Sequence, residues 1–178
     1  MSENLNTQRA NVSLVKRSYK NMLAMGEGVN SADFRMIFSG YPDIEFLVQA
    51  SQLPEIKREL IDSKGPHGVM FKQQGNVLNA GDITITIKEV VTGKALEFLR
   101  DVVRNKVYLD IVIALVSETQ PQGIPSTGCL LSDCWIEVDG TDFSVEDGTT
   151  LIKPNGTIHY NWSSMFDDPA ELGAVGWE

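Results

Sequence analysis

Several residues of this 178-residue chain have types and spacings that suggest chemistry, but no group completes a catalytic or binding pattern. The segment 123–128 has the glycine spacing of a phosphate-binding loop. Cys129 and Leu130 then stand where such a loop needs a lysine and a hydroxyl residue. The two histidines, His67 and His159, have no neighbour in the sequence that suggests a catalytic triad. We therefore assign no catalytic and no cofactor-binding residue.

Four carboxylates crowd the segment 139–148, which we predict to be a hairpin, and they raise the possibility of a calcium site: Asp139, Asp142, Glu146 and Asp147. Counting from Asp139, Phe143 falls on a ligand position of the twelve-residue calcium loop, so the spacing fails. We interpret these residues as solvated turn carboxylates and assign no metal ligand. His159 alternates with Ile158 and Tyr160, so we expect its side chain to face solvent or a subunit contact.

Cys129 and Cys134 are the two cysteines, and both fall in one predicted strand. Five residues of extended chain separate them by about 16 Å, which is beyond the reach of a disulfide. Because strand side chains alternate, we expect the two thiols on opposite faces and both reduced. Two isolated thiols without close Cys or His partners also indicate no metal site.

Composition and charge narrow the class of protein. A hydrophobic content of 42% and a charged content of 22% are typical of one globular domain with a substantial core. The net charge of -9 opposes binding to a phosphate backbone. Solubility alone accounts for such a charge, and it would also suit a conduit through which DNA slides. The polar first residues and the absence of an apolar run long enough to cross a bilayer lead us to expect synthesis in the cytoplasm and no membrane partner.

The element that must position everything else is a strand–helix–strand unit over residues 81–116. Residues 82–88 alternate between isoleucine and polar side chains, which predicts a strand. Residues 94–106 have the apolar spacing of one amphipathic helix, with Thr92 as its expected N-cap. Residues 107–116 are the most apolar strand, which we expect to be central. The predicted class is mainly β (α+β): a β-sandwich or barrel with one flanking helix, 94–106, and a possible N-terminal helix.

The residues before the strand–helix–strand unit contain signals for a helix, strands and turns. Val12, Val15, Tyr19 and Met22 form a helical stripe that ends at Gly26. Alternation over 44–48 predicts a strand that ends before Pro54. Propensity favours a short helix over 55–62, although an extended loop that crosses to a neighbouring subunit has a similar pattern. A turn at 65–68, a short strand at 69–73 and a polar turn at 75–81 should follow.

Three strands are predicted near the C-terminus. One has a face made of Leu130, Cys134, Ile136 and Val138; a short strand holds Phe143 and Val145; and the last runs through 158–162. We divide the chain into an N-terminal arm or helix (1–30), a β domain (31–166) and a C-terminal tail (167–178). The tail contains Leu172, Val175 and Trp177, and it either docks on a partner or folds back on its own domain.

The order of these segments resembles the tail tube protein of contractile-tailed bacteriophages, a family that shares its fold with the tube protein of type VI secretion. The resemblance rests on the strand and Ala-x-x-Leu-Pro corner within 46–56, on Ala80-Gly81-Asp82 before the alternating strand, and on the strand 128–137 with its short hairpins. It covers residues 34–166. The segment 1–30 departs from the shortest family members, which leaves open a tube subunit or a tube-like ring or adaptor at one end of a tail.

The resemblance implies a structural virion protein and no enzyme. It implies hexameric rings whose strands join in one β-barrel, rings that stack into an inner tube, and DNA that passes through the lumen without specific binding. It also implies sheath, baseplate and tail-terminator proteins as partners, and a location in the virion tail. We expect contacts between subunits from the loop 54–80 and both termini, and a lumen or rim position for 139–148. A carbohydrate-binding β-sandwich is the rival, with Trp135 and Tyr160 as its aromatic platform.

Overall fold

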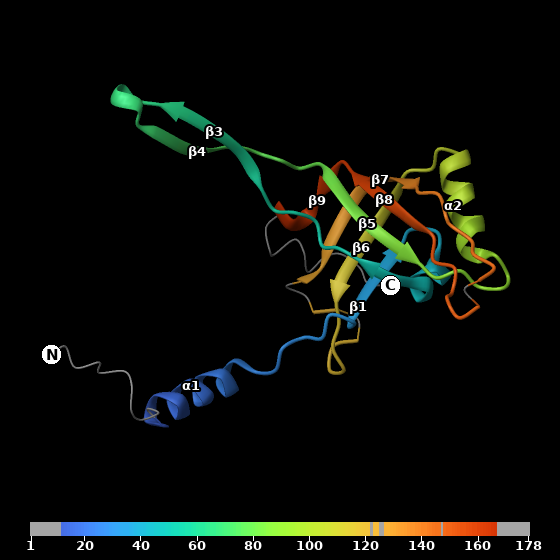
Figure 1. Ribbon diagram of the computed structural model, residues 1–178, viewed down its shortest axis with the longest axis horizontal. Helices are drawn as coiled ribbons and strands as arrows, with labels where there is room; N and C mark the ends of the chain where they lie inside the picture. The colour runs from blue at the N-terminus through green and yellow to red at the C-terminus, as the bar shows by residue number, and fades with distance from the viewer. Residues whose placement is uncertain (1–11, 122, 125–126, 147, 167–178) are drawn as a thin grey trace. The chain divides into compact units, whose positions relative to one another are not determined.

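In the computed structural model of this protein, the described residues are 12–121, 123–124, 127–146 and 148–166 (Figure 1). The chain divides after Ser31 into two units, which are described separately. No helix in these described ranges is both long and apolar enough to cross a membrane.

The first unit contains the helix α1, Val12–Met25, as the apolar stripe predicts. None of its side chains is buried. The helix ends at Gly26, whose φ of +86° is the left-handed conformation that favours glycine, and the Gly26 amide donates to the Leu23 carbonyl.

The second unit is built on an antiparallel sheet that curls into a nearly closed barrel, which confirms the mainly β class (Figure 1). The strands lie in the order β1-β6-β7-β8-β5-β2, and β9 pairs with β7. Their bounds are β1 Phe34–Phe38, β2 Val48–Ser51, β5 Gly81–Ile87, β6 Leu109–Leu115, β7 Cys129–Val138, β8 Asn155–Tyr160 and β9 Trp162–Ser163. Trp162, which we expected in the last long strand, belongs to the separate strand β9.

The predicted strand–helix–strand unit is confirmed as β5, α2 (Lys94–Arg104) and β6. The isoleucines of β5 are buried in the core, and its threonine side is more open. Helix α2 closes the same core with Phe98, whose ring packs edge-on against Phe38 and Tyr41 at centroid distances of 5.3 and 4.8 Å. The predicted cap at Thr92 is wrong. The N-cap is Gly93, and the Glu89 carboxylate accepts hydrogen bonds from the first-turn amides of Ala95 and Leu96.

The predicted strand over 44–48 is wrong. A 3-10 helix, η1 (Pro42–Leu47), occupies most of it, and β2 begins only at Val48. Proline suits the first turn of a helix because it lacks the amide proton that would be unpaired there. Ile44 anchors η1 in the core, whereas Phe46 is 83% exposed.

The prediction that the two cysteines face opposite sides is also wrong, because β7 contains an irregularity. Asp133 has a φ of 53°, and the register of β7 against β6 shifts beside it. The extra residue reverses the alternation, as in a β-bulge. Cys129 and Cys134 are therefore both buried in one core, as free thiols. Leu131 takes the buried place on this face that we expected for Leu130.

No strand forms at Phe143 and Val145, and the described residues of 139–148 show no strand pairing, so the predicted hairpin is wrong. These two side chains are 74% and 103% exposed, so nothing within the described part of the unit covers them. The expectations for Asp147 and for the tail 167–178 lie outside the described residues.

Candidate assembly interface

The region that sequence reasoning predicted least well is an exposed hairpin. Strands β3 (Arg58–Lys64) and β4 (Met70–Val77) pair only with each other, and Figure 1 shows them projecting from the sheet. The short helix predicted over 55–62 is therefore wrong, because cross-strand pairing overrides the local helix propensity. The strand predicted at 69–73 is confirmed, but β4 continues to Val77, so only residues 78–80 of the turn predicted over 75–81 lie outside strands. The turn predicted at 65–68 is confirmed as η2, Pro66–Gly68.

The hairpin turn is tight and has defined geometry. His67 and Gly68 both have positive φ, of 62° and 81°, which is the conformation that two-residue turns between twisted strands need. The Gly65 amide donates to the Val69 carbonyl over 2.7 Å. A Cβ atom at Gly65 would lie 3.2 Å from the ring of Phe71, so glycine lets this ring cover the turn. His67 thus lies at the tip of the hairpin and His159 lies in the sheet, on separate elements.

Both faces of the hairpin carry uncovered apolar side chains. Every residue of β3 is exposed, and so are six of the eight residues of β4. The register places Ile61 and Phe71 on one face, and Leu60 and Met70 on the other. Their exposures run from 46% to 62%. A two-stranded hairpin with no packed face is marginal in water, so this element needs a partner surface for stability.

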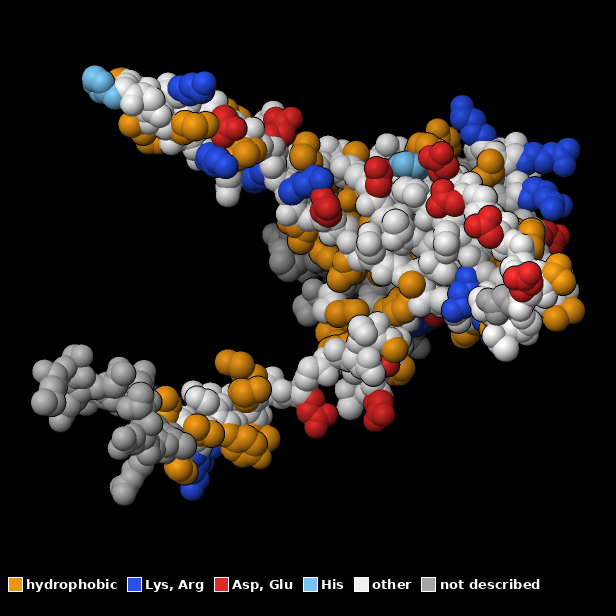
Figure 2. Space-filling model, viewed as in Figure 1, with side chains coloured by type: hydrophobic (Ala, Val, Ile, Leu, Met, Phe, Trp, Pro, Cys, Tyr) orange, Lys and Arg blue, Asp and Glu red, His pale blue; other side chains and the backbone are white. Residues whose placement is uncertain are grey.

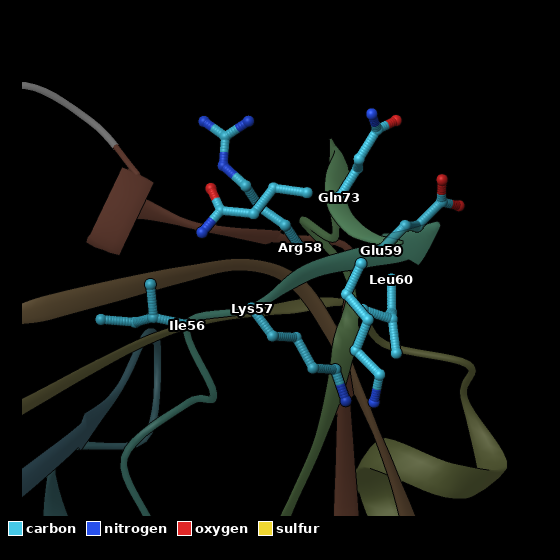
Figure 3. A pocket seen from close by; sticks show the side chains of 8 residues that line it. Ile56, Lys57, Arg58, Glu59, Leu60 and Gln73 are labelled. Carbon is cyan, nitrogen blue, oxygen red and sulfur yellow. The ribbon is translucent and has the colours of Figure 1, made fainter. Parts of the chain in front are cut away.

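The root of the hairpin is hollowed and cationic (Figure 3). A cavity of about 570 Å³ lies there, lined by Ile56, Leu60 and the cations Lys57, Arg58 and Lys72 among others. Figure 3 shows the Arg58 and Lys57 side chains pointing in opposite directions, as neighbours on extended chain do. Lys57 donates to Glu55, which raises the pKa of Lys57. The root therefore suits a partner with apolar and acidic groups.

The sheet also ends in two open edges. Among the described strands, β1 pairs only with β6, and β2 only with β5. The 3-10 helix η1 links these edges, and Arg35 of β1 holds it through both oxygens of Glu45, at 2.5 and 3.2 Å. This half-buried hydrogen bond raises the pKa of Arg35. Open edges expose unpaired backbone groups that can extend a sheet into another chain.

His159 lies on the outer face of the sheet, as predicted, where it links three strands. Its Nδ1 atom is 2.6 Å from Asp82 of β5, and its Nε2 atom is 3.4 Å from Glu137 of β7. Its ring stacks on Trp135 at a centroid distance of 4.0 Å. The two ring nitrogens face different carboxylates, so these groups do not converge on one point as metal ligands would.

Two other predicted features have structural roles. In the loop 120–128, Thr127 donates to the Ile124 carbonyl and accepts from the Leu115 amide, so its hydroxyl closes the loop; residues 122, 125 and 126 lie outside the described part. Tyr160 is 4% exposed, and burial raises its pKa. The aromatic platform expected for carbohydrate binding is therefore incomplete, because only Trp135 of the predicted pair has an exposed side chain.

Comparison with solved structures identifies a tail-tube-like fold. One match is the extended sheath-tube complex of the extracellular contractile injection system PVC, with a TM-score of 0.61 and 13% identity over 80% of this chain and 94% of that one. A second is the tube-terminating cap of the anti-feeding prophage, with a TM-score of 0.58 and 14% identity over 77% and 89%. A third is the PVC sheath/tube terminator, with a TM-score of 0.56 and 12% identity over 77% and 95%. No family model and no curated protein sequence matches this chain.

Proposed function

We propose that this protein is a structural tail protein that assembles with copies of itself into hexameric rings, which stack as the inner tube of a contractile tail in a virion. The observation that carries the proposal is the β3–β4 hairpin, whose apolar faces find no cover among the described residues of its own chain. The tail-tube-like fold supports it, because the matching structures include tube complexes.

The open edges of β1 and β2 support the same proposal. Joining the β1 edge of one copy to the β2 edge of the next would extend the sheet around a ring and remove both edges. The isoleucines of β5 belong to the same buried core as the apolar side of α2, while Thr84 on the opposite side of β5 is exposed. We assign this threonine side to the lumen and α2 to the outer wall. The net charge of -9 would let DNA pass without specific binding.

A ring or cap at the end of a tail is the second candidate. Two of the matching structures are described as a terminating cap and a terminator, with TM-scores close to that of the tube complex. Sheath, baseplate and terminator proteins are the partners that either position would require. We propose no enzymatic role, no cofactor and no metal.

Electron microscopy of the purified full chain tests the proposal. We expect rings of constant diameter that stack into tubes at high concentration; isolated rings that never stack would favour the cap, and a strict monomer would contradict both. The double variant Ile61→Ser with Phe71→Ser removes apolar contact on one hairpin face, so assemblies should be lost while the circular dichroism melting curve of the monomer is unchanged. The matched control is Val91→Ser, which removes a fully exposed apolar side chain outside the hairpin.

A further inference from the structure

The helix α1 has an apolar face that no described residue of its own unit covers. Val15, Tyr19 and Met22 share this face and are 63–70% exposed. Isolated helices shorter than about 12–15 residues are marginal in water, so a helix of 14 residues with nothing buried depends on another surface.

The charge of α1 indicates what kind of surface this is. Lys16, Arg17 and Lys20 lie in the helix, and no carboxylate does; Figure 2 shows hydrophobic and basic side chains together on this segment. None of the three cations has an ion pair within the described residues. Pairing α1 with α1 of another copy would bring like charges together. The helix therefore fits a groove that is apolar and acidic.

The loop 139–153 provides such a groove. A hollow of about 600 Å³ is lined there by Phe143, Leu151 and Ile152, whose side chains are 40–74% exposed. Asp142 and Lys153 also line it. Among the described residues of 139–153, the three carboxylates Asp139, Asp142 and Glu146 outnumber this single cation. Glu146 lies in the same loop and, like Asp142, has no ion pair within the described residues.

The groove is anchored to the sheet at its base. The Glu89 amide donates to the Ile152 carbonyl, and the Ile87 amide donates to the Pro154 carbonyl, each over 3.0 Å. These bonds fix one wall of the groove next to β5, so the backbone that carries the exposed apolar side chains is ordered before a partner binds. An ordered wall lowers the entropy cost of binding a partner.

We propose that α1 of one copy docks in the 139–153 groove of a second copy, with its apolar face on Phe143 and Leu151 and its cations toward Asp142 and Glu146. Opposite charges on two apolar surfaces of the same chain carry the assignment. A helix on one copy that fits a groove on the next is a head-to-tail contact, which generates rings when it closes. The contact needs only two copies and does not depend on the tube geometry.

Cysteine crosslinking between differently tagged copies tests the proposal on the full chain. Both native thiols are buried, so introduced thiols react selectively. A Met22→Cys copy mixed with a Phe143→Cys copy should give a mixed crosslinked dimer with a short bismaleimide, at least about tenfold above Met22→Cys mixed with Val91→Cys. Mixed dimer no stronger than this control overturns the proposal. A second outcome also overturns it. If a chain with both cysteines, diluted with the unsubstituted protein, forms only an internal crosslink, α1 docks on its own chain and not on a second copy.

Charge exchange gives a second readout. Replacing Lys16, Arg17 and Lys20 with glutamate should lower the yield of mixed dimer about tenfold, because three attractions become repulsions. Adding Asp142→Lys and Glu146→Lys to the other copy should restore the yield. Lack of restoration, with circular dichroism showing both variants folded, contradicts the assigned groove. Rings that persist when the crosslink fails would leave the tube proposal standing and overturn only this contact.

Discussion

Strands β5 and β3 have the same length and opposite environments. Each has seven residues and each lies in an antiparallel pairing. Strand β5 lies between β8 and β2, and its isoleucines are 1–2% exposed. Strand β3 has one neighbour, and all seven of its residues are exposed. The two strands are therefore stabilised differently. Strand β5 is stabilised by packing inside its own chain, whereas the stability of β3 depends on the surface that the hairpin contacts.

This difference has a functional meaning. The barrel body can hold its shape in a single copy because its core is complete, with α2 over one side. The hairpin exposes apolar groups at a level that a soluble monomer rarely keeps in one element. We propose that the hairpin is one of the parts that contact other copies and that the body is the scaffold which carries it.

The largest expected difference between the two regions is in thiol reactivity. Burial raises the pKa of Cys134 to about 12 from an ordinary value of 9.0. The thiolate fraction near pH 8 is then about a thousandfold lower than for an ordinary thiol. We expect Cys134 to resist iodoacetamide by at least this factor relative to an introduced Ser63→Cys on β3. Mass spectrometry of timed samples measures both rates, and equal rates would contradict a closed core.

The raised pKa of Cys134 also makes the stability of the fold depend on pH. A raised pKa in the folded state favours the protonated thiol, so this contribution to stability is fully present below pH 9 and is lost as pH rises from 9 toward 12.

Removing an aromatic side chain should change the free energy of unfolding much more in the barrel body than in the hairpin. Phe98→Ala deletes a ring that packs on Phe38 and Tyr41, so the free energy of unfolding should fall by about 3–5 kcal/mol. Phe71→Ala in the hairpin should change it by less than about 0.5 kcal/mol, because that ring is 55% exposed. Urea unfolding at concentrations where the protein is monomeric checks both. A large cost for Phe71→Ala would show that the hairpin packs on its own body.

Two strand glycines give a smaller contrast. A Cβ atom at Gly156 of β8 would lie 2.6 Å from the Glu137 carbonyl oxygen, so Gly156→Ala should cost about 1–3 kcal/mol of unfolding free energy. A Cβ atom at Gly75 of β4 would meet the Glu59 Cβ atom at 3.0 Å and the Ile61 side chain at 3.1 Å. Strand β3, which carries both residues, is hydrogen-bonded only to β4, so it can shift to relieve these contacts. Gly75→Ala should therefore stay within about 1 kcal/mol of the unsubstituted protein. Denaturant titration of both variants tests the contrast, and equal costs would argue against it.

The sequence predicted those elements whose apolar residues find cover inside the chain. The alternation of Ile83, Ile85 and Ile87 predicted β5, and the helical spacing around Phe98 predicted α2, because both patterns report burial against neighbouring elements. Pro42 is a signal for the start of η1 that the apparent alternation over 44–48 outweighed. For the hairpin, the signal was weak, since Leu60 and Ile61 are adjacent and break the alternation of a half-buried strand.

By itself, the sequence determined the mainly β class, the covering helix, the amphipathic α1 and the acidic charge. Local spacing and composition encode these properties directly. The tertiary structure alone decided that Asp133 brings both cysteines into one core, and that residues 58–77 form an uncovered hairpin. A bulge and a free hairpin depend on register between strands, and register is a relation between distant residues that no local pattern contains.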